Sequence, residues 1–135
     1  KAPLQCIPFE ASTEAPSETF PFLLVTGRTL YAFNAGTMTS RTPNRRLRGA
    51  DTLDMEPGDA ARLRFQEGDR VRVRSRHGEA VLPVRLDPRV RSGELFATFH
   101  TAETFLNEVT GPGRDRVVMT PEYKVVAVNV ERCGD

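Results

Sequence analysis

The sequence predicts a small, mainly β barrel with a few short helices, and three features support this. Several short apolar or alternating runs of strand length are separated by turn residues. Only one stretch carries clear helix signals. The chain has 135 residues, of which 39% are hydrophobic and 27% charged, which suits one folded domain and excludes a disordered chain. No apolar run approaches the ~20 residues that span a bilayer, so we expect no membrane segment.

Residues 1–19 predict an extended lead-in or linker, because prolines recur there among scattered polar side chains. The barrel domain is then expected over residues 20–135. Its first strand is the apolar run 22–26, which meets a turn at Gly27. A long polar loop follows, and loops of that length inside a compact domain are usually functional or disordered.

The middle of the chain predicts one helix and a β-hairpin. Residues 56–63 have a proline in the first turn and acids at the amino end, as short helices do. The run 70–74 alternates with period two, Gly78 marks the turn, and residues 82–86 continue the apolar face. Pro83 falls in the second strand, which predicts an edge or a bulge there.

Two further strands complete the predicted barrel. Leu95 starts the first of them. The second covers residues 124–130, where Val126, Val128 and Val130 alternate and therefore share one face.

Charge is unevenly distributed, although the net charge is only +1. Residues 19–50 contain no Asp or Glu, and acids gather just upstream at Glu10, Glu14 and Glu18. The arginines of the acid-free stretch are Arg28, Arg41, Arg45, Arg46 and Arg48. One sign of charge creates a positive potential suited to phosphates, and a solvated basic loop that binds nothing is the alternative.

The arginines of the hairpin raise the separate alternative of nucleic-acid binding, since basic stripes neutralise phosphates. They are Arg70, Arg72, Arg74 and Arg76. Glu67, Asp69 and Glu79 lie alongside them, and stacking aromatics are missing there. Strand alternation puts these arginines on the solvent face by default, so we expect no nucleic-acid partner.

Two segments near the first strand are candidates for ligand contacts. In Thr26-Gly27-Arg28 the glycine lets backbone approach an anion, and the arginine can clamp phosphate oxygens. The loop 31–41 offers small and hydroxyl residues that suit the edges of a heterocycle, namely Asn34, Gly36, Thr37 and Thr39. An ordinary turn with a surface arginine and a flexible loop are the alternatives.

Two later segments are further candidates. Phe99-His100 precedes Asn107, and Tyr123-Lys124 leads into the last strand. A structural histidine and a strand-capping turn are the alternatives. No Ser or Cys nucleophile sits in a recognisable motif beside His100, and the few His and Cys residues offer no zinc ligand set. We therefore expect no catalytic residue and no protein metal ligand in this chain.

Taken in order, these motifs resemble the molydopterin dinucleotide-binding domain of the dimethyl-sulfoxide-reductase superfamily. The segments that carry the resemblance are Thr26-Gly27-Arg28, Gly36-Thr37-Met38-Thr39, Pro57 to Leu63, Gly68 to Val73, Phe99-His100 with Asn107 and Thr110, and Pro121 to Lys124. The resemblance implies a six- or seven-stranded double-psi β-barrel. It also implies that the domain closes over two molybdopterin guanine dinucleotides carrying molybdenum or tungsten, while the metal ligand and any iron–sulfur clusters lie elsewhere in the parent chain.

The residues expected to contact this cofactor all lie in the candidate segments described above. They are Thr26, Gly27, Arg28, Asn34, Gly36, Thr37, Thr39, His100, Asn107, Tyr123 and Lys124. Metal and electron-transfer chemistry belong to the cofactor, so the isolated domain is not expected to be catalytic.

One departure points to a narrower group. Many relatives have His-Thr-Gly-Thr where this chain has Asn34-Ala35-Gly36-Thr37 after Leu30-Tyr31, a version that looks like the catalytic α subunit of formate dehydrogenases. The resemblance thus implies a cytoplasmic parent that oxidises formate to carbon dioxide, with nitrate reductase as an alternative. Other domains of the same subunit and electron-transfer subunits are the expected partners. A free-standing β-barrel binding module without redox cofactor is the alternative from a different class.

Overall fold

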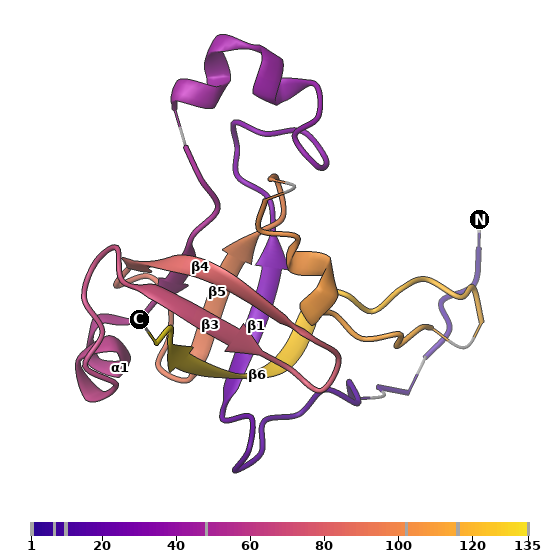
Figure 1. Cartoon of the computed structure of the whole chain (residues 1–135). Coiled ribbons are helices and arrows are strands. Elements are labelled where there is room, and N and C mark those ends of the chain that lie inside the picture. Colours follow the sequence, from indigo (N-terminus) through magenta and orange to yellow (C-terminus); the bar gives the residue numbers. More distant parts are fainter. Residues whose placement is uncertain are drawn as a thin grey trace.

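The computed structural model describes residues 2–6, 8–9, 11–47, 49–101, 103–115 and 117–134, and within them six strands close into a barrel. The strand order is β1-β5-β2-β4-β3-β6 (Figure 1). The strands are β1 (Phe22–Gly27), β2 (Leu53–Met55), β3 (Arg70–Arg74), β4 (Glu79–Leu86), β5 (Glu94–Thr98) and β6 (Val125–Arg132). The short helices are α1 (Pro57–Arg62) and the 3-10 turns η1 (Thr39–Arg41), η2 (Pro43–Arg46) and η3 (Leu106–Val109). The expected mainly β barrel is confirmed. Glu10 and Arg48, which the sequence analysis named, lie outside the described residues.

Strand alternation fills the barrel. Val71 and Val73 of β3 are fully buried, while the arginines between them are exposed, as the period of two predicts. Leu24 of β1, Leu82 of β4 and Leu95 of β5 meet these valines in one continuous core. The hairpin arginines therefore face solvent and leave the interior apolar.

One parallel and one antiparallel pairing of β1 decide which segments meet. β1 pairs in parallel with β5, so the carboxyl ends of both strands reach the same end of the barrel. β6 runs antiparallel to β1, which brings its start to that end as well. We call this the arm end, because residues 28–47 leave β1 there and form an arm that rises clear of the barrel (Figure 1). Three of the predicted candidate segments thus lie at one end.

The sequence analysis did not predict β2, and it predicted the surroundings of Pro83 incorrectly. β2 has three residues, all buried, so it shows no alternation. The predicted edge at Pro83 is wrong, because β4 lies between β3 and β2 in a closed barrel. β3 pairs with β4 as far as Pro83, and β2 begins to pair only at Val84. The proline, which lacks an N–H, therefore stands where one of the two ladders has not yet begun.

Helix α1 is fixed at the end of the barrel opposite the arm. The Glu56 side chain caps it by accepting from Asp59 N at 2.8 Å. The buried Asp59 carboxylate accepts from Gly93 N at 2.6 Å and Ser92 Oγ at 3.1 Å, and pairs with Arg62. Burial raises the pKa of Asp59, but these hydrogen bonds outweigh it and hold that pKa below its ordinary value.

The lead-in was expected to be unpacked, yet one side chain docks it on the barrel. Glu14 Oε2 accepts from Ala127 N at 3.1 Å, near the point where β6 leaves β1 for β3. Both Glu14 oxygens also meet side chains of the β3–β4 turn, the Arg76 guanidinium at 3.2 Å and the His77 imidazole at 3.0 Å. Glu14 thereby ties residues far apart in the sequence to one point on the barrel surface.

Two further observations bear on the setting of the protein. Among the described residues, no helix has the length and apolar character needed to cross a membrane. Cys6 and Cys133 are both free, and Cys6 is exposed.

Candidate cofactor-binding site

The base of the arm is held by His100, which follows β5. Its Nε2 accepts a hydrogen bond from Thr29 N at 3.0 Å, so that nitrogen carries no proton. Its Nδ1 therefore carries the proton and donates it to Asn34 O at 3.0 Å. The imidazole spans the first loop of the arm and fixes both ends of residues 29–34.

A buried carboxylate fixes the segment that carries His100. Asp51 is 2% exposed and lies just before β2. Its Oδ2 accepts from His100 N at 2.9 Å and from both the amide and the hydroxyl of Thr101, at 2.8 and 2.9 Å. Its Oδ1 accepts from the Thr98 hydroxyl. The segment after β5 is thus defined by one side chain.

Gly36 packs directly against this segment. It has a φ of +71°, and a Cβ there would stand 2.9 Å from His100 O and 3.3 Å from His100 Cβ. Both the left-handed backbone and the close approach exclude a larger residue. Glycine at position 36 therefore lets the base of the arm approach the segment after β5 closely.

A cavity of about 730 Å³ lies between the arm and the barrel, within the range of small-molecule sites. Its lining combines backbone with hydroxyl and imidazole groups, among them Thr29, Gly36, Thr37, Thr39, His100 and Thr101. Arg45 and Arg70 line it as cations, and Glu103 is the acid that lines it besides Asp51. The carboxylate of Asp51 accepts hydrogen bonds from its own chain, so the lining offers a ligand hydroxyls, backbone groups, the two arginines and one further acid.

Arg28 lines a second cavity of about 730 Å³, which shares Thr29 and Tyr31 with the first. Arg28 Nη1 donates to the side-chain Oδ1 of Asn34 at 3.1 Å. This partner is neutral, so it orients the guanidinium without compensating its charge, and no carboxylate among the described residues pairs with Arg28. The pair places a cation at the foot of the arm.

The other arginines of the second cavity are compensated by carboxylates. Arg85 pairs with the buried Asp54 and also reaches Asp87, and Arg89 binds Asp87 at 2.7 Å. The hydrogen bond from Arg89 holds the pKa of Asp87 far below its ordinary value. The hydrogen bond to Asp54 raises the pKa of Arg85. This network stabilises the wall of the cavity and leaves Arg28 as its uncompensated guanidinium among the described lining residues.

Tyr123 and Lys124 join the site through an aromatic cluster. The Phe99 ring lies 5.8 Å from the ring of His100 and 6.4 Å, edge-on, from that of Tyr123. Lys124 Nζ lies 5.4 Å from the Phe99 centroid and 5.1 Å from that of Tyr123. The start of β6 thus presents a cation and a phenol beside the segment that carries His100.

Thr26 and Gly27 are held by the barrel itself. Thr26 is 3% exposed, and its hydroxyl donates to Tyr123 O at 2.7 Å. A Cβ on Gly27 would stand 2.5 Å from the ring of Phe96, so packing against that ring explains the glycine. Thr26 and Gly27 are therefore packed into the barrel. Arg28 is the member of the tripeptide whose side chain is exposed.

Three predicted residues, Thr37, Thr39 and Asn107, do not take part in the hydrogen bonds around His100. Thr39 Oγ1 accepts from Phe33 N at 3.0 Å, and Thr37 is exposed at the cavity wall. Asn107 lies on η3, which packs against β4, and its carbonyl accepts from Thr110. The structure therefore brings Arg28, Asn34, Gly36 and His100 into one contact chain, and it leaves Asn107 outside that chain.

Asp51 and Phe99 are the central residues that the sequence analysis did not select. Asp51 is the first acid after the acid-free stretch, a signal that was present in the sequence. Its partners lie 47 to 50 positions away, which no local pattern reveals. Phe99 stood inside a candidate segment and was passed over in favour of His100.

The comparisons with known proteins show which family this chain belongs to. The family model of the molydopterin dinucleotide binding domain matches residues 22–127. The chain is 34% identical over 127 residues to the F420-dependent formate dehydrogenase subunit alpha of Methanocaldococcus jannaschii, covering 93% of this chain and 19% of that protein. It is also 34% identical over 124 residues to F420-dependent formate dehydrogenase 1 subunit alpha of Methanococcus maripaludis, covering 88% of this chain and 18% of that protein.

A solved structure shows the same fold. Acetylene hydratase from Pelobacter acetylenicus superposes with a TM-score of 0.71 and 15% identity, covering 84% of this chain and 18% of that structure. The chain thus spans about a fifth of the length of the relatives that it matches. The barrel, the arm end and the matched residues 22–127 identify this chain as a member of the molydopterin dinucleotide binding domain family.

Proposed function

We propose that this chain holds molybdopterin guanine dinucleotide in a molybdenum or tungsten oxidoreductase, and that the parent enzyme oxidises formate to carbon dioxide. The observation that carries the proposal is the cavity between the arm and the barrel, lined by hydroxyls, backbone and arginine, on an arm whose residues 28–47 contain no acid. A dinucleotide with several negative charges and many heterocycle donors and acceptors requires such a lining.

The residues of the arm end fit this group by their chemistry. Arg28 and Arg45 offer guanidinium groups for phosphate oxygens, and Thr37 offers a hydroxyl at the cavity wall. Tyr123 and Lys124 add a phenol and an ammonium beside Phe99. When bound, the group supplies the metal and its redox chemistry, while this domain supplies binding and orientation.

The assignment of formate as the substrate is supported by the names of the relatives. Two curated relatives at 34% identity are α subunits of formate dehydrogenases, and the Asn34-Ala35-Gly36-Thr37 segment supports the same assignment. The family membership disfavours a free-standing module without such a cofactor. The free cysteines are what a reducing compartment favours, which supports a cytoplasmic parent.

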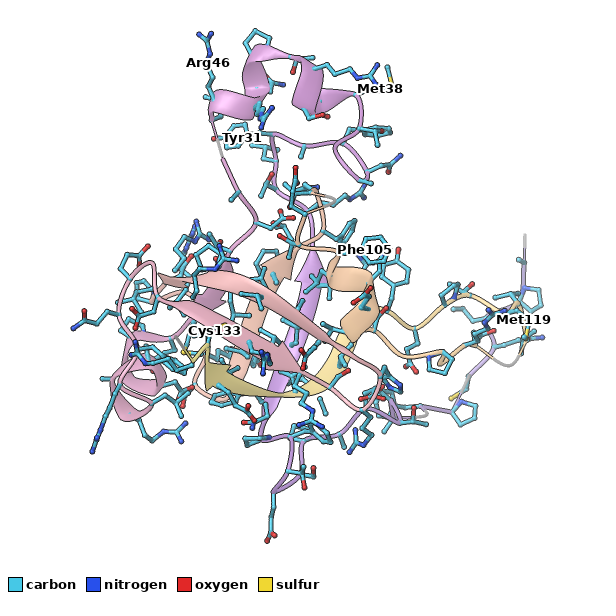
Figure 2. All side chains as sticks on the ribbon, viewed as in Figure 1. Tyr31, Met38, Arg46, Phe105, Met119 and Cys133 are labelled. Carbon is cyan, nitrogen blue, oxygen red and sulfur yellow. The ribbon has the colours of Figure 1, made fainter. Side chains whose placement is uncertain are left out.

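The expected partners follow from what the arm exposes. Leu30 is 92% exposed and Met38 is 76% exposed, and apolar side chains gathered on one projection mark a contact surface. Figure 2 shows Met38 and Arg46 at the far end of the arm and Tyr31 nearer the barrel. We infer that the arm packs against other domains of the same catalytic subunit, with electron-transfer subunits as further partners.

The test uses the full-length parent, purified without oxygen. We expect released guanine nucleotide and molybdenum or tungsten in stoichiometric amounts, together with formate-dependent reduction of a dye. The isolated domain, loaded with metal, is expected to reduce no dye, because the ligands and clusters of the reaction lie elsewhere. A folded parent that contains neither nucleotide nor metal would refute the cofactor proposal, and a loaded parent inactive on formate would refute the substrate.

A further inference from the structure

We propose that Asp51 and His100 are positioning residues that together set the orientation of Arg28 at the foot of the arm. This inference rests on the proposed function, since it concerns how the chain presents its cofactor contacts. It assigns a role to a buried acid, and it assigns to His100 a role other than that of a direct ligand contact.

The first step of this relay is the set of hydrogen bonds that the Asp51 side chain accepts. Its carboxylate accepts hydrogen bonds from the amides of His100 and Thr101 and from the hydroxyls of Thr98 and Thr101. These hydrogen bonds converge on one side chain, and burial excludes competing water. The segment after β5 therefore has one backbone conformation, and the imidazole leaves it in one direction.

The second step is the imidazole of His100. Both of its nitrogens are taken by backbone atoms of the arm, Nε2 by Thr29 N and Nδ1 by Asn34 O. A neutral imidazole has one donor and one acceptor, so neither remains for a ligand in the plane of the ring. His100 therefore ties the arm to the barrel and does not itself offer a hydrogen bond to the cofactor.

The third step is Asn34. Its backbone carbonyl is held by His100, and its side-chain Oδ1 accepts from Arg28 Nη1 at 3.1 Å. Its φ of +49° lies in the left-handed region, which asparagine tolerates better than most residues. The order of contacts is thus Asp51, His100, Asn34 and Arg28, and the last member is the exposed cation proposed to meet phosphate.

Asp59 offers a matched control. It is buried like Asp51 and likewise fixes a turn, by accepting from Gly93 N and Ser92 Oγ. It lies at the opposite end of the barrel, where β1 and β5 begin. Its removal is expected to weaken the barrel without reaching the arm, which separates a positioning role from a merely stabilising one.

The experiment compares Asp51→Ala, Asp51→Asn and Asp59→Ala in the full-length parent. The first readout is hydrogen exchange of the backbone amides over residues 29–36 and 100–101, and the second is guanine nucleotide retained per folded protein. We expect Asp51→Ala to speed exchange at the arm base by about tenfold or more and to lower retention by a similar factor. Asp59→Ala should lower the thermal midpoint while leaving both readouts unchanged.

Asp51→Asn is the conservative variant. Its amide oxygen can still accept from the His100 and Thr101 amides, and its NH₂ can donate to the Thr98 hydroxyl. We therefore expect it to restore most of the exchange protection and retention lost in Asp51→Ala. An asparagine variant as impaired as the alanine variant, or an alanine variant with unchanged exchange at the arm base, would overturn the relay.

The two proposals can fail separately. If the wild-type parent holds no guanine nucleotide, the proposed function fails, while hydrogen exchange still tests the relay. If the wild-type parent holds the nucleotide and Asp51→Ala keeps both retention and exchange unchanged, the relay fails and the proposed function stands.

Discussion

The arm and the β3–β4 hairpin are both rich in arginine, yet they differ in what surrounds the charge. In the hairpin, Arg72 meets Glu79 at 3.4 Å and Arg76 meets Glu14 at 3.2 Å. At the foot of the arm, Arg28 meets a neutral amide oxygen and no carboxylate among the described residues, and residues 28–47 contain no acid. We infer that missing carboxylates mark the proposed anion site at the arm more than the number of arginines does.

The two regions also differ in how they are held. The hairpin is fixed by two continuous strand ladders, β3 with β4 and β3 with β6. The base of the arm is fixed by a few side-chain bonds from His100 and by the close packing of Gly36. Single substitutions should therefore act locally in the arm and globally in the hairpin.

The largest expected effect is on two glycines, one from each region. In Gly36→Ala the new methyl group meets His100 O at 2.9 Å at a positive φ, and in Gly78→Ala it meets Glu108 O at 2.4 Å. Because backbone atoms stand in the way, each should cost about 2–3 kcal/mol. We expect Gly36→Ala to appear as faster hydrogen exchange confined to the arm base, and Gly78→Ala as a lower midpoint of urea unfolding.

Gly68→Ala is the control for these variants. Gly68 also has a positive φ, of +84°, but no atom stands within 4 Å of its added Cβ. It should therefore lose only the conformational part, about 1 kcal/mol. A loss equal to that of Gly78→Ala would show that steric contact is not the cause at position 78.

A smaller effect is expected at Glu14, which fastens the lead-in beside the hairpin. Burial raises its pKa, but the hydrogen bonds from His77 and from Ala127 N, with the charges of His77 and Arg76, outweigh it and lower the pKa below 4.5. A carboxyl whose pKa falls on folding stabilises the fold above its ordinary pKa, and this stabilisation is lost as the pH falls through the folded value.

Glu14→Gln should therefore lower stability near neutral pH by about 1 kcal/mol, with the difference from wild type shrinking in acid. Urea unfolding of both proteins across a pH series measures this difference. The His77→Gln substitution in both backgrounds removes the contribution of the His77 imidazole to this difference. A difference that stays constant down to the lowest pH would show that Glu14 acts without its charge.

Most of the fold could be predicted from the sequence, because buried and exposed residues alternate along most strands. Val71 and Val73 alternate with arginines, so the bounds of β3 were predicted to the residue. β2 was missed because its three residues are all buried and give no period. Pro83 misled, because sequence alone does not show that a short neighbouring strand starts one residue later.

Only part of the candidate site could be predicted from the sequence. Arg28, Asn34, Gly36 and His100 could be selected from local motifs, and the structure joins them through contacts. Asp51 could not be selected, because a buried carboxylate finds its partners through the fold and not through its neighbours in the chain. Glu14 was counted only as part of an acidic cluster for the same reason.

The comparison of arm and hairpin is tested most directly by Arg28→Ala against Arg72→Ala in the full-length parent. A charge-assisted hydrogen bond contributes roughly 1.5–3 kcal/mol, so Arg28→Ala should weaken retention of the cofactor by ~10- to 100-fold. Arg72 is exposed and already meets Glu79, so its removal should change retention little. The measurement is released guanine nucleotide and metal per folded protein. Loss of cofactor in Arg28→Ala with retention in Arg72→Ala is the predicted result, and the reverse pattern would contradict the placement of the site at the arm.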